Sequence, residues 1–420
     1  MLTGPGITAN NITATKAEKW YLIYPFHLIL TNWLYSAGNE LKMDSDYFVG
    51  PERIEIFEPS NTPMRMGDPS ELAVSNYQRV CDAIEVKDFE TAYQYLELQF
   101  ASMKTMIVIF SQWFCAYQCA AEKLLNHDNA LLATDLAYQH WTENVRSISE
   151  TGSLEHKIVG NVALLLDPNK LTPQLAQAVI EGLNEGQIST FLSDALEMYE
   201  LYKSRLLDSL DSGKQATVHT RYHEYFICAR TWHDALMQYT DSFPTVAAIQ
   251  FGQLVAEQLV DQSFKIAPFS HALWQFGSTL SQKQLAAFLL EHLRDHYSGP
   301  NREGTALLIE HEDRYQLIFD PCGSGGAMRR RLGARQYRLS SASSATFGKK
   351  NEVPPYCAHC AFNTITSIER FGWPIYVTEF NEDPQKPCGW TIYKNPEDIP
   401  DFYFENVGYK KDPRKFIRRS

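Results

Sequence analysis

Residues 105–121, TMIVIFSQWFCAYQCAA, contain no charged side chain and form the most apolar long run in the chain. The run also carries four polar side chains, Ser111, Gln112, Tyr117 and Gln118. A helix that spans a bilayer needs about 20 mostly apolar residues. The run therefore predicts a buried core helix of a soluble protein, and we expect no membrane partner.

The composition is that of an ordinary globular chain, with 44% hydrophobic and 21% charged residues. The net charge of −12 argues against a protein whose main partner is nucleic acid. The first residues lack the early positive charge and apolar run of a signal peptide, so we expect a cytoplasmic protein. Cysteines stay reduced in that compartment, where clustered ones serve as metal ligands or redox groups.

Helical periodicity extends from the apolar run in both directions. The expected helices cover residues 17–37, 69–89, 90–125, 129–149, 173–185, 188–210, 218–239, 245–263 and 281–297, with a loop over residues 38–69. The pattern changes at residues 298–304, SGPNREG. We therefore predict a mainly α protein. A large helical domain over residues 1–299 precedes a small α+β domain over residues 300–420, which ends in a basic tail.

The second part shows strand patterns. Residues 306–309 and 315–319 predict a β-hairpin with a charged turn at residues 311–313. PIYVTEF and GWTIYK are further strand candidates, and residues 360–371 predict one helix that ends at Gly372.

Four of the eight cysteines fall in this part, namely Cys322, Cys357, Cys360 and Cys388. Cys322 in DPCGSGG and Cys388 in KPCGW each lie between Pro and Gly, which shape turns whose N–H groups can face a thiolate. Cys357 and Cys360 form a CxxC pair. The four predict a zinc-type metal site, because tetrahedral Zn²⁺ takes four such ligands.

His359 lies inside the CxxC pair and could replace one thiolate, as could His311. Only one CxxC is present, without the stacked spacing of ferredoxin clusters, so zinc is favoured over an iron–sulfur cluster.

The CxxC pair also permits a redox interpretation. CAHC at the start of a helix resembles the active-site pattern of the thioredoxin and disulfide isomerase group, in which the helix N-terminus lowers the pKa of the first thiol. Trp373-Pro374 extends that resemblance to the later cis-proline of the group. The residues before the pair, SSASSATFGKKNEVPPY, depart from the pattern because they predict a loop instead of a strand.

Two further groups of residues suggest a ligand. Arg329, Arg330 and Arg331 follow the glycine-rich turn after Cys322 and could bind an anion. His219, His223, Arg230 and His233 fall on one stripe of a single helix, and His292 and His296 repeat the four-residue spacing. We interpret His219, His223 and His296 as candidate acid–base groups, against the plainer interpretation of a solvated polar face.

Three functions fit these patterns. The first is a zinc enzyme that acts on a small, anionic metabolite at the junction of the two domains. The second is a zinc-stabilised ligand-binding or regulatory protein without catalysis. The third is a CxxC thiol–disulfide oxidoreductase.

Overall fold

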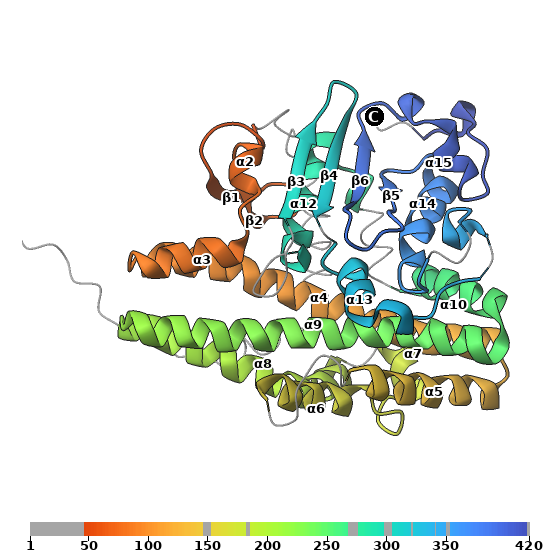
Figure 1. Cartoon of the computed structure of the whole chain (residues 1–420), viewed down its shortest axis with the longest axis horizontal. Helices are drawn as coiled ribbons and strands as arrows, with labels where there is room; N and C mark the ends of the chain where they lie inside the picture. The colour runs from red at the N-terminus through yellow and green to blue at the C-terminus, as the bar shows by residue number, and fades with distance from the viewer. Residues whose placement is uncertain are drawn as a thin grey trace, which may run out of the picture.

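The computed structural model describes residues 46–145, 153–181, 185–267, 276–297, 305–320, 322–340, 342–349 and 353–417. Long helices lie side by side in one part of the molecule, and a four-stranded sheet with shorter helices lies against them (Figure 1). The predicted mainly α architecture with a small α+β part is confirmed at this level. The expected helix over residues 17–37 lies outside the described residues.

The helical part is built around two long helices, α4 (Phe89–Leu124) and α9 (Gln215–Phe251). The apolar run at residues 105–121 lies inside α4, as predicted, and Trp113 and Phe114 on it are buried. In the described part of the chain, no helix combines the length and the apolar character that crossing a membrane requires. The remaining helices of this part are α2 (Pro69–Leu72), α3 (Asn76–Glu85), α5 (His127–Val145), α6 (Leu154–Leu166), α7 (Pro173–Glu181), α8 (Glu185–Ser212), α10 (Gln253–Ile266) and α12 (Gln282–Tyr297).

Helix α9 runs straight through Pro244, where the sequence predicted a break between two helices. Proline removes one backbone hydrogen bond from a helix interior and usually kinks or ends it. Here the helix is buried on this stretch and ends instead at Gly252, whose φ of +94° is readily adopted only by glycine.

A β-hairpin of β1 (Arg53–Phe57) and β2 (Thr62–Met66) occupies part of the stretch that was predicted to be a loop. Pro63 argues against a strand in sequence terms, because it cannot donate to the ladder. It is accommodated opposite Ile56 in a sheet of only two strands.

The second sheet has the order β3-β4-β6-β5 and is antiparallel throughout. The predicted hairpin is confirmed as β3 (Thr305–Glu310) and β4 (Arg314–Asp320), and the two further strands as β5 (Val377–Glu379) and β6 (Cys388–Tyr393). The predicted C-terminal helix is α14 (Ala358–Phe371). Additional short helices are α13 (Gly325–Leu332), η3 (Gly333–Arg335), η4 (Ser344–Thr346), η5 (Pro396–Asp398), α15 (Asp401–Glu405) and η6 (Pro413–Lys415).

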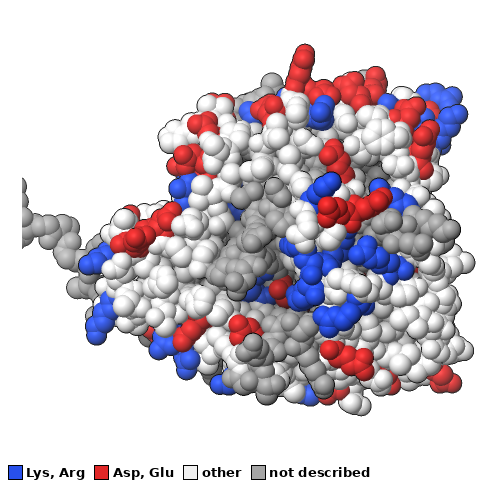
Figure 2. All heavy atoms as spheres, viewed as in Figure 1, with Lys and Arg blue, Asp and Glu red and all other residues white. Residues whose placement is uncertain are grey.

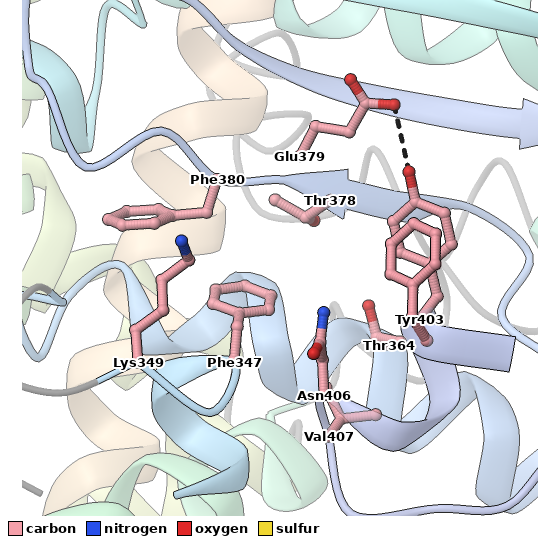
Figure 3. A pocket seen from close by; sticks show the side chains of 10 residues that line it. Phe347, Lys349, Thr364, Thr378, Glu379, Phe380, Tyr403, Asn406 and Val407 are labelled. Carbon is pink, nitrogen blue, oxygen red and sulfur yellow. Dashed lines mark hydrogen bonds between the residues drawn. The ribbon is translucent and has the colours of Figure 1, made fainter. Parts of the chain in front are cut away.

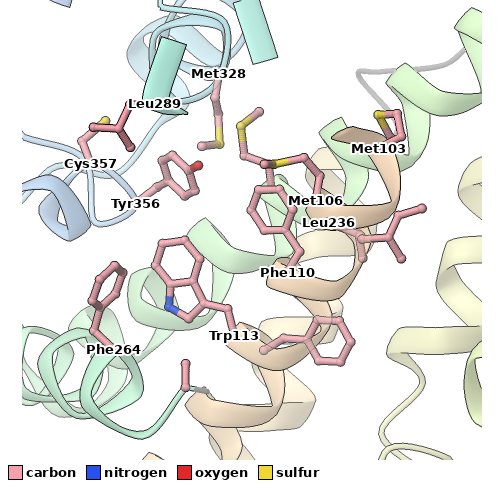
Figure 4. Close-up of a cluster of buried hydrophobic side chains, with 14 of the residues drawn as sticks. Met103, Met106, Phe110, Trp113, Leu236, Phe264, Leu289, Met328, Tyr356 and Cys357 are labelled. Carbon is pink, nitrogen blue, oxygen red and sulfur yellow. The ribbon is translucent and has the colours of Figure 1, made fainter. Parts of the chain in front are cut away.

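The hydrophobic core continues from the helical part into the part with the sheet. Figure 4 shows the join, where Phe110 and Trp113 of α4 lie near Met328 of α13 and near Tyr356. The rings of Trp113 and Tyr356 are 5.9 Å apart. Side chains on both sides of the predicted boundary near Gly299 therefore pack against each other, and the turn before Cys357 rests on helix α4.

Candidate functional site

Four cysteines gather where the four-stranded sheet meets the N-terminal ends of α13 and α14. Cys322 follows β4 and precedes α13, whereas Cys388 opens β6 and pairs with Phe319 of β4. Cys357 is the N-cap of α14 and Cys360 lies in its first turn. The sheet and the two helices thus bring the predicted metal ligands into one region.

The thiols influence one another electrostatically. Burial raises the pKa of Cys357 well above its usual range, and the thiols of Cys360, Cys322 and Cys388 raise it further. Burial also raises the pKa of Cys360, to which Cys322 and Cys388 add. Burial and Cys322 together bring the pKa of Cys388 to about 11. Because interactions between charges weaken with distance, these mutual effects agree with the position of the four cysteines at one junction of sheet and helices.

Two glycines let α13 approach the cysteines closely. A Cβ atom on Gly325 would lie 2.6 Å from the Cys357 sulfur, and one on Gly326 would lie 2.8 Å from Cβ of Cys322. Both separations are shorter than side chains tolerate, so close packing requires glycine at positions 325 and 326. The backbone N–H of Asn381 also faces the sulfur of Cys388 at 3.4 Å.

His359 lies between this cluster and the helical part. Its Nδ1 is 2.6 Å from the backbone oxygen of Tyr356, to which it donates, and this leaves the lone pair of Nε2 facing the Cys360 sulfur at 3.3 Å. The imidazole is 5.3 Å from the ring of Trp113. Burial lowers the pKa of His359 to about 4, so the imidazole is neutral at physiological pH.

Among the described residues, no three Cys, His, Asp or Glu side chains are arranged to hold one metal ion. The fold brings Cys322, Cys357, Cys360 and Cys388 to the same junction of sheet and helices, but it does not show them grouped as ligands of one ion. The zinc site remains a prediction. His311 lies in the β3–β4 turn, at the end of β4 away from Cys322, and its Nε2 is 3.4 Å from Gln316 Oε1. That position separates it from the cysteines.

The three predicted anion-binding arginines all contact other parts of the chain. Arg329 donates to the backbone oxygens of Asn381 (2.8 Å) and Glu382, and Arg330 donates to Pro384 O at 3.0 Å. These two arginines therefore hold the loop between β5 and β6.

Arg331 turns toward α9 instead. It donates to Gln238 Oε1 at 3.0 Å and lies 3.6 Å from Asp234. Figure 2 shows Lys and Arg side chains gathered on the face over α13. Anion binding by Arg329, Arg330 and Arg331 remains a prediction, with much of their donor capacity already used inside the protein.

The histidine stripe is confirmed as part of one helix, but its two ends differ. His219 and His223 are exposed near the start of α9, whereas His233 is buried and its Nδ1 lies 3.0 Å from Asp234 Oδ1. The start of α9 lies at the opposite end of the helical layer from α14 (Figure 1). The structure therefore does not bring His219 and His223 to the cysteines. His296 falls within α12, and its side chain lies outside the description.

A buried carboxylate that sequence analysis missed joins α9 to the CxxC turn. Asp241 is 1% exposed, and its Oδ1 accepts a hydrogen bond from the backbone N–H of Tyr356 at 3.0 Å. Burial raises the pKa of Asp241 to about 6, although Tyr356, Gln336 and Arg331 each pull it down. Asp241 lies in the fully buried stretch of α9 that contains Pro244. The proline marks this stretch in the sequence, but it does not indicate a buried carboxylate.

A pocket of about 200 Å³ lies beside α14 and was also missed. Its wall includes Thr364 of α14, Thr378 of β5, Phe347, Lys349 and Tyr403 (Figure 3). These residues are far apart in the sequence, so no local motif could have marked the pocket. Thr364 Oγ1 lies 3.4 Å from the backbone oxygen of Cys360, which connects the pocket wall to the cysteine cluster.

Compared with known proteins, the chain matches no family model, no curated protein and no solved structure.

Proposed function

We propose that this protein binds Zn²⁺ through Cys322, Cys357, Cys360 and Cys388, and that it acts on a small anionic molecule. The observation that carries the metal half is the convergence of these four thiols from the end of β4, the start of β6 and the first turn of α14. Tetrahedral zinc with Zn–S distances of ~2.3 Å holds sulfur atoms about 3.8 Å apart.

The surroundings of the thiols support a metal site. Gly325 and Gly326 leave room for two of them, and the backbone N–H of Asn381 faces the sulfur of Cys388. Donors of this kind stabilise and orient thiolate ligands. His359 is the alternative ligand to one thiolate, because its Nε2 faces the same sulfur and its Nδ1 is already anchored to a backbone carbonyl.

The dithiol oxidoreductase is less well supported. A thiol that attacks a disulfide must be accessible to its partner. Cys357 is the first cysteine of the pair and is 7% exposed, with the first turn of α13 packed against its sulfur. An enzyme and a ligand-binding protein without catalysis would have the same zinc site. Only a measurement of ligand turnover distinguishes these two functions.

The metal half is tested by the zinc content of the full chain, purified without added metal or chelator. We expect about one zinc ion per chain. Cys388→Ser and Cys322→Ser should each lower the content sharply, because a hydroxyl is a poor replacement for a thiolate. Cys81→Ser is the matched control, since Cys81 is half-buried in the helical part. A chain that is folded and free of zinc, with all four thiols open to alkylation, would sink the metal site.

A further inference from the structure

The pocket beside α14 has the features of a built ligand site. It lies between α14, the last residues of β5 and α15, and its volume is about 200 Å³. That volume has room for roughly seven water molecules at ~30 Å³ each, or for a molecule of about ten non-hydrogen atoms. Figure 3 shows Phe347, Phe380 and Tyr403 around it, with Lys349 on the same side as the two phenylalanines.

One buried hydroxyl in the wall is poorly satisfied by its protein partner. Thr378 is 8% exposed, and its Oγ1 interacts with the sulfur of Cys360 without a well-aligned hydrogen bond. Leaving a buried polar group unpaired costs about 1–3 kcal/mol. A polar atom of a ligand in the pocket would satisfy this hydroxyl and offset that cost.

The charges in the wall favour an anion. Glu379 is already occupied, because its Oε1 accepts from Thr391 at 2.8 Å and Tyr403 at 3.2 Å, and its Oε2 accepts from Gln316 at 3.0 Å. Lys349 is the charged side chain that remains. It pairs at 2.6 Å with Glu382, whose side chain is 46% exposed. Exposed ion pairs are worth little, so a ligand anion can compete for this ammonium group.

The aromatic wall favours a planar, apolar body. The rings of Phe347 and Phe380 are stacked, with their centroids 5.8 Å apart and 15° between their planes. The guanidinium carbon of Arg329 lies over the Phe380 ring, 4.9 Å from its centroid. Phe347 holds a left-handed backbone with φ of +52°, which is unfavourable for a bulky residue. Strained residues of this kind persist where the surrounding structure fixes them, and they are common at binding sites.

We propose that this pocket binds a small organic carboxylate with a planar apolar body, with its carboxylate between Lys349 and the Thr378 hydroxyl. The assignment gives a place to the ligand half of the proposed function, in a pocket beside Thr364 and Thr378. It does not use the sequence-predicted anion site at Arg329, Arg330 and Arg331. Binding here needs no metal, so the two halves of the proposal can fail separately.

The test uses 4-fluorobenzoate, which has the required size and charge, and ¹⁹F NMR of the probe with the full chain. We expect saturable line broadening at millimolar probe, reversed by benzoate. Thr378→Val and Lys349→Gln should each weaken binding about fivefold, the equivalent of one hydrogen bond of ~1 kcal/mol. Thr366→Val is the matched control, because Thr366 is a buried threonine with an unpartnered hydroxyl that does not line the pocket.

Thermal unfolding separates loss of binding from loss of folding. Thr378→Val removes a buried hydroxyl whose interaction with the Cys360 sulfur is poorly aligned, so its melting temperature should stay close to that of the wild type. The assignment is overturned if wild-type protein shows no saturable binding, if Thr378→Val binds as Thr366→Val does, or if neutral 4-fluorobenzamide binds as tightly. If zinc-free Cys388→Ser still binds the probe, the pocket is supported independently of the metal. If wild-type protein contains zinc but does not bind the probe, only the metal site is supported.

Discussion

The backbone N–H of Tyr356 donates a hydrogen bond to Oδ1 of Asp241 at 3.0 Å. Asp241 belongs to the buried stretch of α9, and Tyr356 immediately precedes the first cysteine of the CxxC pair. The bond therefore fixes the position of the candidate site on α9, the longest helix in the part of the chain that the structure describes. Arg331 acts on Asp241 electrostatically from α13, so three elements meet at this carboxylate.

Asp241→Asn should make the protein more stable at neutral pH. Burial raises the folded-state pKa of Asp241 to about 6, above the value of about 3.9 in an unfolded chain. The folded state thus binds the proton more tightly, and its stability falls as the pH rises from about 4 to 6. An asparagine keeps an acceptor for Tyr356 and removes this loss, which amounts to roughly 2–3 kcal/mol.

Chemical denaturation between pH 4 and pH 8 measures that difference. The variant should lose the decline that the wild type shows between pH 4 and 6, provided Arg331, Asp234 and His233 keep their places. Asp208→Asn, at an exposed position of α8, is the control and should leave the profile unchanged. Parallel profiles for wild type and Asp241→Asn would contradict the assignment.

Glu52→Gln should destabilise the protein by about 3 kcal/mol or more, because it leaves the buried Arg65 guanidinium without its ionic partner. Arg65 Nη2 is 2.5 Å from Glu52 Oε2, and their side chains are 0% and 7% exposed. Glu55→Gln is the control on the same hairpin, since Glu55 pairs with Arg53 at an exposed position. Urea denaturation of both variants compares the two losses.

The same carboxylate should contribute to acid sensitivity. Burial alone would raise the pKa of Glu52, but Arg65, Tyr95 and Arg79 bring it below its ordinary value. The stabilisation from a carboxylate with a lowered pKa is present above the unfolded value, about 4.3, and is lost as the pH falls through the folded value. Glu52→Gln should therefore show a shallower loss of stability below about pH 4 than the wild type. Equal slopes would argue that Glu52 is not ionised in the folded protein.

Arg329→Lys should loosen the loop before Cys388. Arg329 is 1% exposed and donates to the backbone oxygens of Asn381 and Glu382. A lysine ammonium cannot reproduce the planar fork that reaches both oxygens. Amide hydrogen exchange in residues 381–387 should become faster in Arg329→Lys, and Arg335→Lys at an exposed position should leave it unchanged. Unchanged exchange in Arg329→Lys would show that the loop is held by other contacts.

The elements that could be predicted from sequence are those with a long or alternating pattern. The apolar run in α4 and the β3–β4 hairpin are both predicted by patterns among residues that are close together in the sequence. The β1–β2 hairpin was missed because Pro63 is tolerated opposite Ile56 in a two-stranded sheet. The continuity of α9 through Pro244 was missed because tertiary packing outweighs the local cost of a proline.

The candidate site divides in the same way. The interpretation of the four cysteines as one metal site rested on similar local turns at Cys322 and Cys388, and it stays a prediction. Asp241 could not be recognised in the sequence, because a single carboxylate in a buried helix does not change the hydrophobic periodicity of that helix. The pocket at Thr378 depends on side chains from α14, β5 and α15, and sequence spacing carries no information about such contacts.

Gly325→Ala should disturb the cysteine cluster directly. A Cβ at this position would lie 2.6 Å from the Cys357 sulfur and 3.2 Å from Cδ1 of Tyr356, so α13 or the CxxC turn must move. An Ala substitution in an ordinary helix favours folding by up to about 1 kcal/mol, and here the collision reverses that sign. We expect loss of stability together with reduced zinc content.

Gly160→Ala in α6 is the matched control, because a Cβ there has no atom within 4 Å. It should raise the melting temperature slightly and leave zinc content unchanged. If Gly325→Ala lowered stability without lowering zinc content, α13 would be needed for packing alone. The metal would then depend on the CxxC turn and Cys388 without help from the approach of α13.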